Sequence, residues 1–219
     1  MTGPDDSGAE GTLGFDRIVF FSDAVFAIVI TLLVLPLTAE IELPEDGTGL
    51  AAAVWSMRTA VLSFAVSFLV VGQFWVAHHR TFGRIRRFDS GLVWLNLLLL
   101  MTVAFMPFPA ALLSRRTDDD AFPVVFYAAS MSLASALMTA TWLVAVHRRL
   151  VDTTIPAHQL REFSVRGLVT TGVFAASIGV AFLGLGPAVL MWLVVLPAAR
   201  ALAHRWRPTA PADRVTTAA

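Results

Sequence analysis

An aspartate lies inside an apolar segment that is long enough to cross a membrane. Asp23 follows Phe21 and Ser22 in the run RIVFFSDAVFAIVITLLVLPL, which extends from Arg17 to Leu37. A charged side chain within a bilayer costs a few kcal/mol, so it usually finds a partner, water or a functional role. The chemistry open to Asp23 is therefore a hydrogen bond between helices, a cation contact or a proton relay.

Partners for this carboxylate occur near the end of the next apolar segment, in GQFWVAHHRTF. If the two segments form an antiparallel hairpin, Trp75, His78 and His79 reach the depth of Asp23. An indole donates only and an imidazole can donate, so both match a carboxylate acceptor. We therefore expect a polar network between the first and second helices. Its expected members are Arg17, Phe21, Ser22, Asp23, Trp75 and His78.

Two other interpretations of the histidines remain open. A partly solvated position at the helix end is as good an explanation for His79, and a weaker one for His78. A metal site is disfavoured, because the chain has no Cys and no third ligand converges with the two histidines. We expect no bound metal and no cofactor.

Helical geometry separates Asp23 from an apolar stripe on the same helix. With roughly 100° of rotation per residue, Asp23 falls about 140° from Ile28. If the stripe faces a central axis, Asp23 points into the protein and not into a conduction path. Packing against lipid or within a bundle is the other interpretation of this stripe. The stripe consists of Phe21, Ala24, Ile28, Leu32 and Leu35, with Thr31 at its edge.

The third apolar segment contains an amide and two prolines. Asn96, in WLNLLLL, is expected to bridge helices or to satisfy backbone groups, because intramembrane amides usually act as packing contacts. Pro107 and Pro109 lie further along the same helix. Proline removes a backbone donor, so the regular hydrogen bonding should end or kink there.

The composition of the chain indicates the class of protein that positions these side chains. The 219 residues are 57% hydrophobic and 15% charged, which is typical of a polytopic membrane protein and leaves no room for a large soluble domain. A formal net charge of zero gives no indication of nucleic-acid binding. The leader before Arg17 is acidic, so it is not a typical signal peptide, and the first helix should be retained.

Apolar runs recur with the length of about 20 residues that a membrane helix needs. We expect an all-α integral membrane protein with six transmembrane helices in one domain, residues 17–205. The tails 1–16 and 206–219 should be disordered and cytoplasmic. The turn signal GLGP, Gly184 to Pro187, separates the last two helices. The six expected spans are 18–38, 51–76, 91–113, 121–146, 165–185 and 187–204.

The distribution of arginine predicts the orientation. With six spans and both termini cytoplasmic, most arginines flank the inner ends of the helices, and only Arg115 and Arg116 lie in an outer loop. The positive-inside rule therefore favours this topology in the cell membrane.

Residues 17–114 resemble the transmembrane protein 175 family, which contains endosomal and lysosomal potassium channels and their bacterial homologues. The segments FWVAHHRTF and WLNLLLLMTVAFMPFPAALLS are similar to that family's second and third helices. The first-helix motif is carried by Arg17, Phe21-Ser22-Asp23, Ala27-Ile28 and Thr31-Leu32-Leu33.

The resemblance implies a cation channel that favours potassium. The chain has one such motif, as bacterial members do, and these assemble as homotetramers around their first helices. It further implies that Phe-Ser-Asp joins the first and second helices and that Ile28, Leu32 and Leu35 narrow the pore. Thr31 is then available to a partly dehydrated ion. The implied partners are potassium ions, the lipid bilayer and three further copies of the chain.

The residues themselves agree with a pore that lacks the usual filter. TVGYG does not occur, and no segment carries arginines at regular three-residue intervals, so neither a carbonyl filter nor a typical voltage sensor is present. A proton-permeable channel and a proton-coupled transporter remain alternatives, because Asp23 and His78 can titrate. An enzyme is disfavoured: Asp23 has no second membrane aspartate, and HExxH and GxSG are absent.

Overall fold

The computed structural model of the chain describes residues 6–39, 49–117, 120–195, 197 and 201, and the regular elements within these residues are helical. The elements are α1 (Asp6–Leu32), α2 (Leu35–Ala39), α3 (Leu50–Ser56), α4 (Arg58–Phe82), α5 (Ser90–Phe105), α6 (Pro107–Ser114), α7 (Phe122–His147), α8 (Ala157–Ala181), α9 (Leu185–Leu190) and a π-helical turn, η1 (Met191–Val195).

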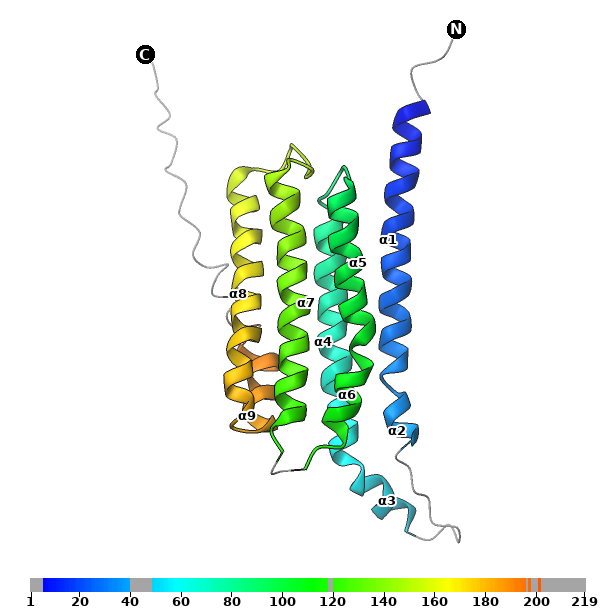
Figure 1. Cartoon of the computed structure of the whole chain (residues 1–219), viewed down its shortest axis with the longest axis vertical. Helices are drawn as coiled ribbons and strands as arrows, with labels where there is room; N and C mark the ends of the chain where they lie inside the picture. The colour runs from blue at the N-terminus through cyan, green and yellow to red at the C-terminus, as the bar shows by residue number, and fades with distance from the viewer. Residues whose placement is uncertain (1–5, 40–48, 118–119, 196, 198–200, 202–219) are drawn as a thin grey trace, which may run out of the picture.

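The long helices run alternately up and down the bundle (Figure 1). Helix α1 lies at one side against α4 and α5, and α7 joins this part to α8. The α4–α5 and α7–α8 connections lie at the same end as the start of α1, whereas α2, α3 and α9 lie towards the other end. The candidate network and the α1 stripe are therefore positioned by α1, α4 and α5.

Prolines interrupt two of these helical segments, at Pro107 as the sequence predicts and also at Pro36, where no break was predicted. Pro36 cannot donate to Leu32, and α1 ends at Leu32 before a short turn leads into α2. Pro107 likewise begins α6 after α5 ends at Phe105. These two apolar segments are thus each completed by a second short helix, α2 and α6.

Five candidate spans occur in the part of the chain that the structure describes. Each is long and apolar enough to cross a hydrocarbon core of about 30 Å. The five are Asp16–Thr38, Arg58–Phe82, Ser90–Ser114, Phe122–His147 and Ala157–Ala181. The all-helical membrane fold is therefore confirmed, and with it five of the six predicted spans.

The sixth predicted span, 187–204, is not present as a membrane-length helix in the described residues. Its described part is the shorter apolar helix Leu185–Val194, which changes to π-helical turns at Met191. Beyond Val195 the structure describes residues 197 and 201 alone. The predicted C-terminal tail, 206–219, lies outside the described residues.

Three boundaries differ from the prediction. The second span begins at Arg58 and not at 51, which leaves the guanidinium at the end of the span, where a charge costs less than inside it. The fifth begins at Ala157 and not at 165, because Arg166 and Glu162 form an ion pair (2.7 Å) that supports a polar first section of α8. Residues 6–16, expected to be disordered, lie within α1.

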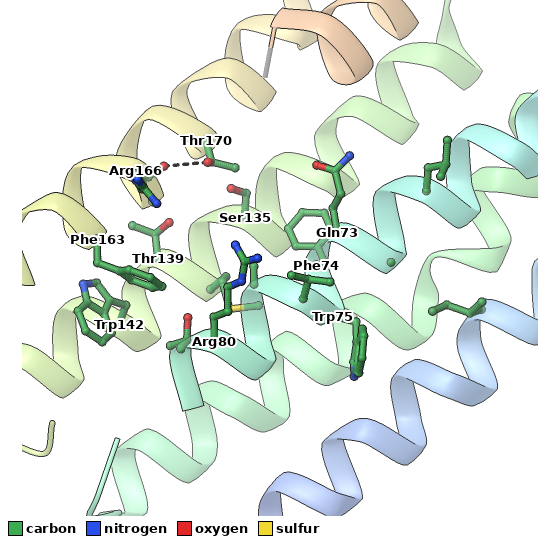
Figure 2. Close-up of a pocket in the computed structure, with 18 of the residues that line it drawn as sticks. Gln73, Phe74, Trp75, Arg80, Ser135, Thr139, Trp142, Phe163, Arg166 and Thr170 are labelled. Carbon is green, nitrogen blue, oxygen red and sulfur yellow. Dashed lines mark hydrogen bonds between the residues drawn. The ribbon is translucent and has the colours of Figure 1, made fainter. Parts of the chain in front are cut away.

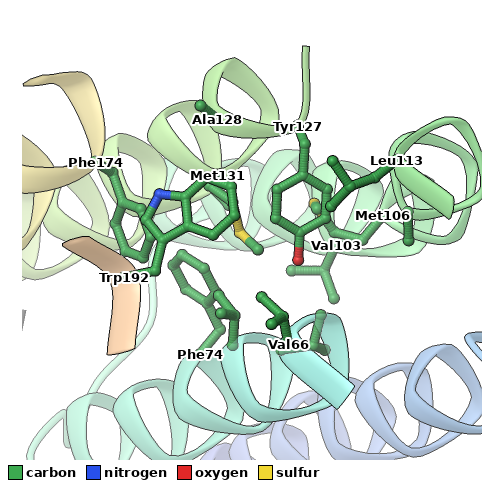
Figure 3. Close-up of a cluster of buried hydrophobic side chains, with 14 of the residues drawn as sticks. Val66, Phe74, Val103, Met106, Leu113, Tyr127, Ala128, Met131, Phe174 and Trp192 are labelled. Atoms are coloured by element: carbon green, nitrogen blue, oxygen red, sulfur yellow. The ribbon is translucent and has the colours of Figure 1, made fainter. Parts of the chain in front are cut away.

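The core runs through the whole bundle, with residues from α1 and from α4 to η1, and Figure 3 shows the part where the α5–α6 segment, α4, α7, α8 and η1 meet. Tyr127 packs on Trp192 with ring centroids 5.1 Å apart, and Phe74 stacks on Phe174 at 5.6 Å. Such contacts matter in a bilayer because lipid tails are as apolar as the side chains, so close packing holds the helices together.

Small residues allow α7 and α8 to approach closely. A Cβ atom added to Gly167 would lie 3.1 Å from the Thr139 hydroxyl oxygen, which is tighter than ordinary contact. The Thr171 hydroxyl is 3.0 Å from that of Ser135 and 2.9 Å from that of Thr139. The α7–α8 pair is therefore joined by close packing and by hydroxyl hydrogen bonds.

Candidate functional site

Helix α1 has one covered face and one face that the rest of the chain leaves open. Ser22, Phe26, Val29 and Leu33 are buried against α4 and α5. The predicted stripe lies on the open face: Phe21 is 53% exposed, Ile28 58%, Leu32 38% and Leu35 54%. These residues therefore share the face of α1 that the rest of the described chain leaves open.

Asp23 is joined to the second membrane helix by one hydrogen bond. Trp75 of α4 donates its Nε1–H to Asp23 Oδ1 at 2.9 Å. The carboxylate is half-buried, so this bond connects α1 to α4 at the edge of the covered face. The predicted contact between the first helix and Trp75 is present.

A second chain of hydrogen bonds links α1, α5 and α4 in the buried interior. Asn96 Nδ2 donates to Ser22 Oγ at 3.0 Å, and Asn96 Oδ1 lies 2.9 Å from His78 Nε2. The Ser22 hydroxyl donates to the Ile18 carbonyl oxygen at 2.9 Å. Ser22, Asn96 and His78 are almost fully buried, which makes each of these bonds costly to lose.

The direction of this chain fixes the tautomer of His78. The Ser22 proton is used on Ile18, so Ser22 must accept from the Asn96 amide nitrogen. The Asn96 oxygen then faces His78 and can only accept, so His78 carries its proton on Nε2. Its Nδ1 atom is buried and has no hydrogen-bond partner among the described residues. A second proton on this ring would therefore lack an acceptor there.

Aromatic rings enclose the imidazole. Phe82 stacks on His78 with centroids 4.0 Å apart, and the Phe26 ring is 5.4 Å away. Phe26 belongs to α1, so the covered face of α1 packs directly on the histidine of α4. The polar chain is consequently shielded from the open α1 stripe.

The predicted network therefore divides into two parts. His78 was expected to contact Asp23, but its hydrogen bond goes to Asn96, because the amide of Asn96 is buried next to the imidazole ring. Arg17 is exposed and forms no hydrogen bond or ion pair with these residues in the described structure. Phe21 lies on the open face and not among the polar groups. His79 is exposed, with its ring 5.9 Å from that of Trp75.

Asn96 was expected to bridge helices or to satisfy backbone groups, and it does bridge α1 and α4, as the central member of the buried chain. The depth of Asn96 in the bundle, counted from one end, could have been used to predict this role. Asn96 lies six residues after the start of α5, and Ser22 lies six residues after the start of its span at Asp16. His78 lies four residues before the end of α4, at the same end of the bundle. Counting residues from that end places all three at similar depth.

Ion pairs connect the two loops at this end of the bundle. Arg86 pairs with Asp152 at 2.9 Å, and Arg148 pairs with Asp89 at 2.6 Å. Hydrogen bonds from the Thr154 backbone and side chain, followed by that from Arg86, lower the pKa of Asp152 to about 2. The hydrogen bond from Arg148 likewise holds the pKa of Asp89 below its usual value.

Asp89 also determines where α5 begins. Its side chain accepts a hydrogen bond from the Leu92 backbone N–H at 2.8 Å, which is the usual arrangement of an N-cap residue. In the described residues no group of three His, Asp or Glu side chains could hold a metal ion.

Comparison with known proteins supports a specific relationship. The family model described as endosomal/lysosomal potassium channel TMEM175 matches residues 17–107. A protein from Streptomyces collinus that is named a potassium channel is 34% identical over 172 residues, covering 76% of this chain and 82% of that protein.

Two further proteins extend this comparison. The crystal structure of a lysosomal potassium-selective channel TMEM175 homolog from Chamaesiphon minutus has a TM-score of 0.73 and 28% sequence identity, covering 87% of this chain and 98% of that chain. A human protein named an endosomal/lysosomal proton channel is 33% identical over 110 residues, which cover 50% of this chain and 21% of that protein.

Proposed function

The chain belongs to the TMEM175 family of ion channels, and from this premise we propose that it is a potassium-selective channel whose pore is lined by α1. It is a multi-pass membrane protein and not an enzyme. In the proposed assembly four chains surround a central axis, and the channel conducts without a voltage sensor. The bacterial relatives named potassium channels support potassium as the permeant ion.

The observation that carries this proposal is the open apolar face of α1. Ile28, Leu32 and Leu35 are all substantially exposed in the single chain, at helical spacings that align them on one stripe. The opposite face is held against α4 and α5 by the Asp23–Trp75 bond and the chain through Asn96. A helix fixed on one side and open on the other is suited to line an axis between copies.

A ring of these side chains would form a hydrophobic constriction. Four copies related by a closed rotation would bring each of Ile28, Leu32 and Leu35 into its own ring. Apolar constrictions of this kind gate by dewetting. Mutating a ring position to a polar residue should therefore hydrate the pore and increase the flux of cations.

Thr31 lies at the edge of the stripe and offers a hydroxyl group to such a pore. Its hydroxyl donates to the Ile28 carbonyl oxygen at 2.7 Å, so the proton is occupied and the oxygen lone pairs remain as acceptors. In the proposed pore these oxygens contact a partly dehydrated cation, between the levels of Ile28 and Leu32.

The orientation follows from the arginines. The loops that contain Arg86 and Arg148 lie at the same end of the bundle as the start of α1. We place this end in the cytoplasm of the cell by the positive-inside rule. Both termini are cytoplasmic in this proposal, which requires a sixth crossing after α8.

Flux from liposomes tests the proposal. Purified protein would be reconstituted and the movement of potassium, sodium and protons compared for the wild type, Ile28→Asn and the matched control Ile28→Leu. We expect potassium flux to exceed sodium flux, the Asn variant to raise flux with poorer selectivity, and the Leu variant to resemble the wild type. Equal flux for all three proteins would contradict the proposal that Ile28 lines the pore.

A proton-permeable channel or a proton-coupled transporter is the second candidate. Two ionisable side chains, Asp23 and His78, lie in the contacts that join α1, α4 and α5, and this is the observation that favours it. The mammalian relatives named proton channels support it as well. A proton gradient alone would drive potassium uphill in a coupled transporter, whereas a channel passes each ion only down its own gradient. The same liposomes distinguish the two.

A further inference from the structure

A large cavity extends along α4 and is lined mainly by α4, α7 and α8, with Ile30 of α1 and Ala201 at its margin (Figure 2). Its volume is about 1080 Å³, slightly above the range of roughly 300–1,000 Å³ usual for small-molecule sites. Phe68, Leu69 and Val76 on the α4 wall are exposed. The cavity therefore opens to the side of the bundle, where a membrane protein meets lipid.

One end of this cavity is basic. Arg80 of α4 and Arg166 of α8 line the same space as Ser135 and Thr139 of α7 (Figure 2). Arg80 lies two residues before the end of α4 and Arg166 nine residues after the start of α8, so both lie in the half of the bundle that carries the basic loops. The two guanidinium groups supply charged N–H donors of the kind that bind an anion.

Positive charge at this end is only partly balanced. Arg166 Nη2 pairs with Glu162 at 2.7 Å, but its Nε atom is buried without a hydrogen-bond partner among the described residues. Arg80 has no ion pair there. Arg84 lies over the Phe163 ring at 4.3 Å. Its pKa is lowered by burial and then by the charges of Arg80 and Arg166, so the three cations repel one another.

The remaining walls are apolar. They include Leu69, Phe74 and Ile30, and Trp75 and Trp142 lie nearer the basic end. From Leu69 to Arg80 the α4 wall is roughly 16 Å long at 1.5 Å per residue. Tryptophan near a membrane boundary, a basic end and a long apolar groove match the parts of a phospholipid.

We propose that this cavity binds an anionic phospholipid, with its phosphate headgroup between Arg80 and Arg166 and an acyl chain along the α4 wall. Charge complementarity selects this occupant. The chain's own C-terminal segment, 202–219, carries Arg205, Arg207 and Arg214 against a single Asp213, so its charge opposes entry into the basic end. A zwitterionic lipid would supply no net charge for the two arginines.

Native mass spectrometry on the full chain in detergent tests the site. Phosphatidylglycerol and phosphatidylcholine would be titrated against the wild type, Arg80→Gln/Arg166→Gln and the control Arg87→Gln/Arg161→Gln, which removes two exposed arginines outside the cavity. Each arginine near a lipid surface contributes about 1 kcal/mol, so we expect the first variant to bind phosphatidylglycerol roughly 30-fold more weakly. The control and the wild type should bind it equally.

A second pair of variants tests the apolar part without changing charge. Gly72 lines the cavity, and a Cβ atom there meets nothing within 4 Å. Gly72→Leu should fold and occupy the groove, whereas Gly179→Leu places the same side chain in open space outside it. We expect only the first to weaken phosphatidylglycerol binding. This comparison remains decisive if removal of Arg166 prevents folding.

Four results would overturn the proposal. Phosphatidylcholine could bind as tightly as phosphatidylglycerol, or both cavity variants could bind phosphatidylglycerol like their controls. Inorganic phosphate could displace the lipid at millimolar concentration, which would identify a free-anion site. Crosslinking from a photoreactive residue in place of Val76 could capture another copy of the chain or its segment 202–219 instead of lipid.

Discussion

Replacing Asn96 by leucine should destabilise the protein by a defined amount. The substitution removes the hydrogen bonds to His78 (2.9 Å) and Ser22 (3.0 Å). Interhelical hydrogen bonds in membranes average about 0.6 kcal/mol and reach about 1.7 kcal/mol. A buried polar group left without a partner costs about 1–3 kcal/mol. Leucine fills a similar volume, so we expect a total loss of about 1–3 kcal/mol.

The matched control is Thr102→Val on the same helix. Thr102 is buried, but its hydroxyl bonds only the Leu98 carbonyl of its own helix, at 3.0 Å. Its removal should cost less than about 0.5 kcal/mol, since no bond between helices is lost. The free energy of unfolding would be measured for both variants in mixed detergent–SDS micelles by tryptophan fluorescence.

A double variant sharpens this test. Replacing both partners by apolar groups of similar shape costs less than orphaning one of them. Asn96→Leu/His78→Phe should therefore be less destabilised than the sum of the single variants. Equal stability of Asn96→Leu and wild type, or strict additivity, would refute the inference that the chain Ser22–Asn96–His78 holds α1, α5 and α4 together.

Three further predictions concern other contacts. Asp23→Ala and Trp75→Phe should each lower the melting temperature, and their double variant should add little, because both remove the same 2.9 Å hydrogen bond; additive effects would contradict this. Gly167→Leu should destabilise the protein by about 1–3 kcal/mol through overpacking, because an added Cβ lies 3.1 Å from the Thr139 hydroxyl oxygen. The control Gly172→Leu meets open space and should change stability little. Equal loss of stability for the two variants in thermal unfolding would contradict the close packing of α7 on α8. The pKa of Asp152 is depressed to about 2 from 3.8, so its contribution to the stability of the folded state is complete above pH 3.8 and is lost as the pH falls towards 2. The rate of hydrogen exchange at the Arg86 amide, corrected for the intrinsic rate, should therefore rise in that window for the wild type. Asp152→Asn should lose this pH dependence.

Some of the site could be predicted because periodicity and donor chemistry act locally. The rotation between Asp23 and Ile28 depends only on helix geometry, so the stripe could be assigned before any packing was known. Trp75 is a donor at the right depth in an antiparallel helix, and the structure confirms its bond to Asp23. The assignment of the stripe to a pore stays a prediction, since a single chain does not contain the axis.

Other features depended on tertiary packing. His78 could have bonded Asp23 or Asn96 on residue type alone; the amide of α5 is buried beside it, and this position was not visible in the pattern of the third segment. The start of the second span at Arg58 was missed because the apolar run 51–57 continues the hydropathy of α4 across the break at Met57. Hydropathy detects apolar length, not the turn that divides it.

Cysteine accessibility at Ile28 tests the central claim, that the open face of α1 lines the pore. The chain has no cysteine, so Ile28→Cys is the only reactive thiol, and Val29→Cys, on the buried face, is its control. A water-soluble cationic methanethiosulfonate reagent would be added during potassium flux from liposomes. The account predicts strong inhibition of Ile28→Cys and no effect on Val29→Cys. Flux that is unchanged in modified Ile28→Cys would contradict it.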